Sequence, residues 1–311
     1  MEGVVCTVGC PSNAQLAGRA PQCEGCPGRA LCQTSVAVGD PDQELIDCRM
    51  NAIRHKILIL SGKGGVGKST IAAALSLALS RMSFKVGLLD VDICGPSIPQ
   101  LMGVQGQTVV NSSWGWMPLK SPIGDVKVIS VGSLLETDST AIVWRGPRKT
   151  ALIKRFLKDT FFGRLDCLVV DTPPGTSDEH LTIVKLLNNV NPDGAVIVTT
   201  PQKMALYTIK KELDFCRKLS LPVLGIVENM SSFICPCCEE NSELFPNSSV
   251  EKFAEEHCIS YLGRIPVDPN LARCCEEGSN VEQIHPLSPS VKSLKDIAKH
   301  LQIRLMQNEI T

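Results

Sequence analysis

The sequence lacks an excess of charge of either sign and lacks a long apolar run. Its 31 basic and 32 acidic residues leave a formal net charge of −1, so no broad positive field is present to hold duplex nucleic acid. The least polar stretch without a charge, Ser69–Ser80, has 12 residues, whereas a membrane-spanning helix needs about 20. We therefore expect no nucleic-acid partner and no membrane-spanning helix in this chain.

The first 50 residues also lack the basic and apolar regions of a secretory signal. They carry more acidic than basic side chains, unlike a transit peptide. These absences predict a soluble intracellular protein, with the cytoplasm as its expected location. Its 15 cysteines are an odd number and fall below the density of a small disulfide scaffold. In a reducing compartment, clustered cysteines bind metal or perform redox chemistry more often than they form disulfides.

The positions of the cysteines suggest two domains. Residues 1–52 contain little aliphatic periodicity and cannot bury a core, so we expect a flexible extension that a metal would organise. Residues 53–311 are predicted to form the second domain. The extension contains Cys6, Cys10, Cys23, Cys26, Cys32 and Cys48. Later groups are Cys235, Cys237 and Cys238, and the pair Cys274–Cys275. We expect the isolated thiols to be buried as small apolar side chains. These are Cys48, Cys94, Cys167, Cys216 and Cys258.

Short apolar runs alternate with helical stretches in the second domain. Runs that are apolar throughout are typical of strands buried on both faces of a parallel sheet. The predicted strands are Lys56–Leu60, Val86–Asp90, Val126–Val131, Cys167–Asp171, Ala195–Thr199 and Val223–Val227. The predicted helices are Ser69–Ser80, Arg148–Asp159, Glu179–Asn188 and Lys203–Leu219. Thr176 and Glu179 are expected to form a capping box at the start of the third helix. The alternation predicts a doubly wound α/β domain with a mostly parallel sheet.

A phosphate-binding motif follows the first predicted strand and opens the first predicted helix. The residues that match G-x-x-x-x-G-K-[ST] are Gly62, Lys63, Gly64, Gly65, Val66, Gly67, Lys68 and Ser69, and Thr70 continues the segment. Its glycines allow backbone N–H groups and the helix N-terminus to face phosphates. Lys68 is expected to reach the phosphates and Ser69 to bind Mg²⁺. The motif predicts a P-loop ATPase with ATP and Mg²⁺ as ligands.

Two strand ends carry acidic residues. Asp171 ends an apolar strand, where a carboxylate is costly unless it has a function, so we expect it to anchor the Mg²⁺ shell. The alternative is a loop-starting Asp that caps a turn. Asp90 ends the second predicted strand and Asp92 follows it, and Asp92 is a candidate for orienting the attacking water.

Lys63 completes the form K-G-G-V-G-K-S, which resembles the deviant Walker A motif of the ParA/MinD/iron-protein class of ATPases. The segments at 88–97 (LLDVDICGPS) and 170–180 (VDTPPGTSDEH) resemble the MRP/NBP nucleotide-binding proteins, which are scaffolds of iron–sulfur cluster assembly. Glu228–Met230 and Gly263–Pro266 fit the same family, and the resemblance covers about residues 56–305. It implies that Lys63 reaches the partner subunit's nucleotide, that Asp92 orients water, and that Asp171 holds Mg²⁺. It also implies that Asn229 contacts the base.

Cys235 and Cys238 form a C-x-x-C pair. In the resembled family such a pair from each of two subunits binds one [4Fe–4S] cluster across the dimer axis, because a cluster takes four thiolates and two-fold symmetry doubles each pair. Zinc is the alternative from the residues alone, although the second C-x-x-C of a zinc ribbon is absent 15–20 residues later. Cys237 is an additional thiol between them.

The extension carries a second candidate cluster site in Cys23-x₂-Cys26-x₅-Cys32, with Cys10 as the fourth ligand. The eukaryotic cytosolic scaffold subtype of the family carries a lone cysteine about thirteen residues ahead of this motif. Cys10 leaves twelve residues between and Cys6 leaves sixteen. The alternative is a flexible tail with incidental cysteines.

These features together predict an ATP-dependent scaffold that assembles [4Fe–4S] clusters and transfers them to cytosolic and nuclear apo-proteins. Its expected partners are acceptor proteins, downstream assembly factors, and either a second copy or a shorter paralogue. An electron-transfer iron protein and a positioning ATPase are the alternatives. The positioning ATPase gains support from a C-terminal apolar stripe that would lie on a membrane or pack on its own domain. The stripe consists of Val291, Leu294, Ile297, Ala298, Leu301 and Leu305.

Overall fold

The computed structural model describes residues 24, 29, 41–134, 146–245 and 249–308. The chain divides into two compact units, Met1–Ile46 and Asp47–Thr311. Helix α2 (Pro41–Asn51) begins in the first unit and ends in the second. The predicted ligands Cys10, Cys23, Cys26 and Cys32 lie outside the described residues, as does Cys6, so the predicted boundary and cluster site of the extension stay predictions.

A mixed sheet is the central layer of the second unit. Its strands are β1 (Ile53–Leu60), β2 (Val86–Asp90), β5 (Leu119–Lys120), β6 (Val126–Ser130), β7 (Leu165–Asp171), β8 (Gly194–Thr199), β9 (Val223–Ile234), β10 (Asn241–Glu243) and β11 (Tyr261–Val267). The order is β10-β9-β8-β1-β7-β2-β6-β5, and β11 also pairs with β9. Only β5 and β10 are antiparallel to their neighbours among these described strands. A separate hairpin joins β3 (Val110–Ser112) to β4 (Gly115–Met117).

The parallel strands form where the sequence is apolar throughout, since both faces of the sheet are covered. Every residue of β2 and of β8 is buried. All six predicted strands are present, but β9 continues seven residues past the predicted end at Val227. Strand β11 was missed, because Gly263 and Pro266 interrupt its apolar pattern and glycine and proline weaken a strand signal.

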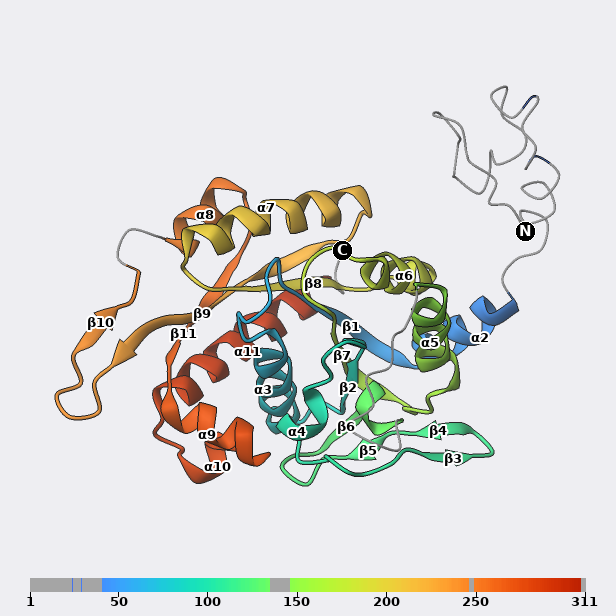
Figure 1. Cartoon of the computed structure of the whole chain (residues 1–311), viewed down its shortest axis with the longest axis horizontal. Coiled ribbons are helices and arrows are strands. Elements are labelled where there is room, and N and C mark those ends of the chain that lie inside the picture. Colours follow the sequence, from blue (N-terminus) through green and yellow to red (C-terminus); the bar gives the residue numbers. More distant parts are fainter. Residues whose placement is uncertain (1–23, 25–28, 30–40, 135–145, 246–248, 309–311) are drawn as a thin grey trace. The chain divides into compact units, whose positions relative to one another are not determined.

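Helices cover both faces of the sheet (Figure 1), which confirms the doubly wound prediction. Figure 1 shows α3 (Lys68–Arg81) and α11 (Pro289–Asn308) on one side, and α6 (Asp178–Leu187) and α7 (Lys203–Lys218) on the other. The remaining described helices are α4 (Ile98–Leu101), α5 (Gly146–Asp159), α8 (Val250–Glu256), α9 (Pro269–Glu277) and α10 (Val281–Ile284), with the 3-10 turns η2 (Val131–Ser133) and η3 (Asn188–Val190). Neighbouring β1 and β7 are followed by helices on opposite faces, which opens a crevice at their carboxyl ends.

The C-terminal apolar stripe packs inside its own domain. All six of its side chains on α11 are buried, and five of them join the core that α3 shares with the sheet. This packing confirms the intradomain interpretation and removes the observation that favoured a membrane-associated positioning ATPase. No helix in the described part of the chain is long and apolar enough to cross a membrane.

Two local predictions were wrong. The cap of α6 is Ser177 rather than Thr176, and its box is completed by His180 rather than Glu179. Cys167 and Cys216 are buried as predicted, but the other isolated thiols, Cys48, Cys94 and Cys258, are exposed. Cys94 lies in the loop after β2, and Cys258 has a φ of 56° in the turn after α8, so apolar neighbours in sequence do not bury them.

Candidate functional site

The phosphate-binding loop connects the end of β1 to the first turn of α3. Gly65 and Gly67 adopt positive φ angles of 78° and 83°, a region that L side chains rarely adopt. Gly67 is also the N-cap of α3, so the backbone N–H groups of the first helical turn have no intrahelical acceptor. The loop borders a cavity of about 230 Å³, which is also lined by Asp92, Ser97 and Pro174. The N-terminus of α3 and the ammonium of Lys68 together favour phosphate here.

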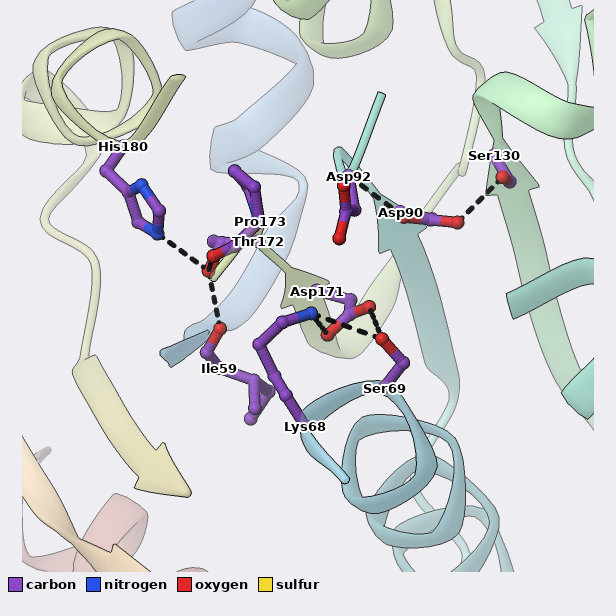
Figure 2. Close-up of polar contacts among 10 residues, drawn as sticks. All are labelled: Ile59, Lys68, Ser69, Asp90, Asp92, Ser130, Asp171, Thr172, Pro173 and His180. Carbon is purple, nitrogen blue, oxygen red and sulfur yellow. Dashed lines mark hydrogen bonds and ion pairs between the residues drawn. The ribbon is translucent and has the colours of Figure 1, made fainter. Parts of the chain in front are cut away.

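Lys68 and Ser69, which line this cavity, both hydrogen-bond the carboxylate of Asp171 (Figure 2). Lys68 Nζ donates to Asp171 Oδ1 at 2.6 Å, and Ser69 Oγ donates to Asp171 Oδ2 at 2.6 Å. The side chains of Lys68 and Asp171 are 6% and 1% exposed. Burial raises the pKa of Asp171, while Lys68 and the hydroxyl of Ser69 act against that rise. A hydroxyl and a carboxylate this close offer the oxygen donors that Mg²⁺ takes in P-loop NTPases.

The two acidic residues at the end of β2 and just after it have different environments. Asp90 is buried and accepts hydrogen bonds from Ser130 Oγ at 2.8 Å and from the backbone N–H of Asp92 at 3.0 Å (Figure 2). Burial, and then the charge of Asp171, raise the pKa of Asp90 to about 8. Asp92 lines the cavity, and partial burial raises its pKa as well. Of this pair, Asp92 is therefore the one placed to meet a water beside bound phosphate.

His180 holds the loop that follows Asp171. Its Nδ1 accepts from the backbone N–H of Ser177 at 3.1 Å, which leaves Nε2 to donate to Thr172 Oγ1 at 3.1 Å. Thr172 Oγ1 in turn donates to the carbonyl of Ile59 at 2.7 Å. Burial lowers the pKa of His180 to about 4, so the ring is neutral at physiological pH. The sequence places this histidine beside the loop after Asp171 and is compatible with its helix-capping role, but its hydrogen bond to Thr172 depends on the fold.

Lys63 and Asn229 approach the loop from different elements. Lys63 lines the cavity, and its Nζ donates to Gln202 Oε1 at 3.3 Å in an exposed position at the start of α7. Asn229 lies within β9 and is buried, and its Nδ2 donates to the carbonyl of Val66 at 2.9 Å. A contact of Asn229 with a base stays a prediction, as does the action of Lys63 on a partner's nucleotide.

Cys235 and Cys238 lie in the turn between β9 and β10, on an arm that Figure 1 shows extending past the neighbouring helices. The turn is closed by the backbone N–H of Cys235, which donates to Glu240 O at 3.0 Å. The backbone N–H groups of Cys238 and then Cys237 hydrogen-bond the Cys235 thiol and lower its pKa. Cys235 is half-buried, whereas Cys237 and Cys238 are exposed. Among the described residues, no three or more His, Cys, Asp or Glu side chains form a metal site within one chain.

The comparisons with known proteins decide the family. The model of the NUBPL iron-transfer P-loop NTPases, of the ParA group, matches residues 52–302. The chain belongs to this family. It is 46% identical over 297 residues to the cytosolic Fe-S cluster assembly factor NBP35 of Eremothecium gossypii, covering 94% of this chain and 89% of that protein.

Solved structures agree with this assignment. A nucleotide-binding protein from Archaeoglobus fulgidus, in complex with ADP, is 36% identical with a TM-score of 0.69, covering 78% of this chain and 94% of that one. The septum site-determining protein MinD of Pyrococcus horikoshii, complexed with Mg-ADP, is 21% identical with a TM-score of 0.60, covering 80% and 96% of the two chains. The second likeness shows the fold alone. The predicted fold, the family resemblance and the P-loop NTPase class of the enzyme are thereby confirmed.

Proposed function

We propose that this member of the NUBPL iron-transfer family assembles [4Fe–4S] clusters with the help of ATP and transfers them to cytosolic and nuclear apo-proteins. The family's description and the name of the Eremothecium gossypii relative support iron–sulfur cargo and a cytosolic location. The observation that carries the proposal is the position of the cysteine pair. Cys235 directly follows β9, the strand whose Asn229 hydrogen-bonds the phosphate-binding loop.

The nucleotide site would hold ATP and Mg²⁺ with residues already in place. Ser69 and Asp171 would hold Mg²⁺, which would offset the charge of the phosphates. Lys68 would leave its 2.6 Å ion pair with Asp171 and turn toward the phosphates, since the Asp171 carboxylate and the phosphates are both anionic partners for its single ammonium group. Thr70 and the backbone of Gly62–Ser69 complete the proposed nucleotide contacts.

Hydrolysis would use two residues that line the cavity without joining the ion pair. Asp92 would orient the attacking water, because it projects from the loop beside the phosphate-binding loop. Lys63 would act on the nucleotide of a partner subunit. Its exposed position, with Nζ hydrogen-bonded to Gln202 at the surface, leaves it able to reach a second chain. This requires a homodimer or a pairing with a shorter paralogue.

The cluster would bind between two subunits. Cys235 and Cys238 supply half of the thiolates that a [4Fe–4S] cluster takes, and two-fold symmetry supplies the other half. The depressed pKa of Cys235 favours the thiolate that iron binds. Cys10, Cys23, Cys26 and Cys32 would hold a second cluster in the extension. Release of the bridging cluster to apo-proteins completes the proposed cycle.

Anaerobic reconstitution with iron and sulfide tests this function. Wild-type protein, Cys23→Ala/Cys26→Ala, Cys235→Ala/Cys238→Ala and the control Cys237→Ala would be compared by absorption, EPR and metal analysis. We expect two cluster sites in the wild type and in the control, and the loss of a different site in each double variant. Tight zinc, or no sulfide-containing species in any protein, would contradict the proposal.

A further inference from the structure

Strand β9 connects the phosphate-binding loop to the cysteine pair through one continuous segment. Asn229 lies at the loop and Cys235 directly follows the end of the strand. Asn229 and Cys235 are six residues apart, so the segment between them spans at most about 20 Å at roughly 3.3 Å per residue. No other described segment carries both a contact with the loop and a cysteine of the C-x-x-C pair.

The contact at the loop end is tight. Asn229 Nδ2 donates to Val66 O, and a Cβ at residue 67 would overlap the Asn229 amide. The same Cβ would lie 3.9 Å from Met230 Cε, so Met230 also faces this point of the loop. Because Gly67 is the N-cap of α3, Asn229 contacts the loop, and Met230 lies beside it, where its amides turn toward phosphate.

The strand is irregular at this contact. Met230 has a φ of 54°, a left-handed conformation that costs a residue with a long side chain free energy. Between the pairs Asn229–Ile265 and Phe233–Val267, β9 advances four residues while β11 advances two. The extra residues form a bulge, and bulges beside functional sites redirect the side chains and the strand that follow. The direction in which β9 continues toward Cys235 is therefore set at Met230.

We propose that Asn229 and Met230 are positioning residues that transmit the nucleotide state of the phosphate-binding loop along β9 to the Cys235–Cys238 turn. The inference rests on the proposed function for its purpose, since the turn would hold the cluster. A shift of Val66 and Gly67 on nucleotide binding displaces the Asn229 amide. The bulge at Met230 converts that displacement into a change in the turn.

Hydrogen–deuterium exchange of the full-length protein tests this link without requiring a cluster. Exchange at residues 231–243 would be measured in the protein without nucleotide, with Mg·ADP, and with Mg²⁺ and a non-hydrolysable ATP analogue. Titration would confirm that each nucleotide is saturating. Coupled sites commonly alter each other by about 5- to 150-fold, so we expect at least a roughly fivefold change in the wild type. Alkylation of Cys235 by iodoacetamide, resolved by mass spectrometry, gives a second readout.

Four variants separate the link from general packing. Asn229→Ala and Met230→Gly should reduce the nucleotide-dependent change in exchange at residues 231–243 nearly to zero. Met230→Ala removes the same side chain as the glycine variant but keeps the restricted backbone, so it should retain most of the response. Tyr261→Phe is the matched control, because it removes a 2.6 Å hydrogen bond to Glu228, the neighbour of Asn229, without touching the loop.

The proposal is overturned if Asn229→Ala and Met230→Gly respond as the wild type does, or if Tyr261→Phe loses the response equally. If Asn229→Ala fails to fold, the comparison of glycine and alanine at position 230 decides. Nucleotide-dependent cluster transfer that persists in both coupling variants would sink this inference and leave the proposed function standing. Failure to load any cluster would contradict the proposed function. The exchange data would still test the coupling between the phosphate-binding loop and the cysteine turn.

Discussion

Lys68 and Asp171 form a buried ion pair, with Nζ and Oδ1 2.6 Å apart. Their partnership joins the first turn of α3 to the end of β7, which are distant in sequence. Lys68 lines the cavity in which phosphate and Mg²⁺ would bind, as does Ser69, the other hydrogen-bond partner of Asp171. The pair therefore stabilises the site before nucleotide arrives. When nucleotide and Mg²⁺ bind, the contact between Lys68 and Asp171 would be replaced by contacts of Lys68 with phosphate and of Asp171 with Mg²⁺.

Removing one partner of this pair should destabilise the protein far more than removing both. Lys68→Met leaves Asp171 buried without its cation, a change that costs about 3–5 kcal/mol in comparable pairs. Adding Asp171→Asn should recover much of that loss. Denaturant unfolding at pH 8 measures both, with exposed Lys63→Met as the control that should change stability little. Additive losses in the double variant would show that the two residues do not act as a pair.

Two inactive variants should restore hydrolysis when mixed. Lys63→Ala and Asp92→Asn each leave every site of a homodimer incomplete if Lys63 acts on the partner's nucleotide. In a mixed dimer, the subunit with Lys63→Ala keeps its own Asp92 and receives Lys63 from the other chain. Equal mixing should give roughly a quarter of the wild-type rate, the statistical expectation for a two-fold dimer. Phosphate release measures this, and no recovery in dimers shown to exchange subunits would place Lys63 in its own site.

The Cys235 thiol should ionise below the ordinary thiol pKa of about 8.5 because backbone N–H groups stabilise its thiolate. Cys238→Ser keeps the donating N–H, whereas Cys238→Pro removes it. The rate of alkylation of Cys235 should therefore rise at a higher pH in the proline variant than in the serine variant. Mass spectrometry of the labelled peptide across pH 5–10 would follow this. Identical profiles would mean that the hydrogen bonds have no effect on the thiolate.

Glu212 should make the protein less stable as the pH rises. Its side chain on α7 is 1% exposed, its Oε2 has no hydrogen-bond partner, and burial raises its pKa to about 7. Because the pKa of Glu212 is higher in the folded than in the unfolded protein, its contribution to the free energy of unfolding is fully present below about pH 4.5. That contribution is lost as the pH rises through about 7. The loss is about 3 kcal/mol for a shift of this size.

Glu212→Gln keeps the shape and cannot ionise. Its advantage over the wild type in denaturant unfolding should therefore grow between pH 5 and pH 8, as the carboxylate forms only in the wild type. The exposed Glu256→Gln serves as the control and should show no such growth. An advantage that stays constant with pH would mean that Glu212 does not titrate in this range.

The sequence by itself determined the features that depend on neighbouring residues. The loop at Gly62–Ser69 follows from its glycine spacing between an apolar run and a helix. The buried parallel strands follow from runs such as Val86–Asp90, because a strand covered on both faces tolerates only apolar side chains. The cysteine pair at 235 and 238 was visible from spacing alone. The family resemblance added roles that local patterns cannot supply.

Only the tertiary structure decided the features that depend on contacts between distant segments. Which of Asp90 and Asp92 lines the cavity depends on Ser130, a strand away. The exposure of Cys94 depends on where its loop lies, and the role of Asn229 on its meeting with Val66, 163 positions earlier. Burial, hydrogen-bond partners and pKa shifts arise from three-dimensional proximity, and periodicity along the chain carries no record of it.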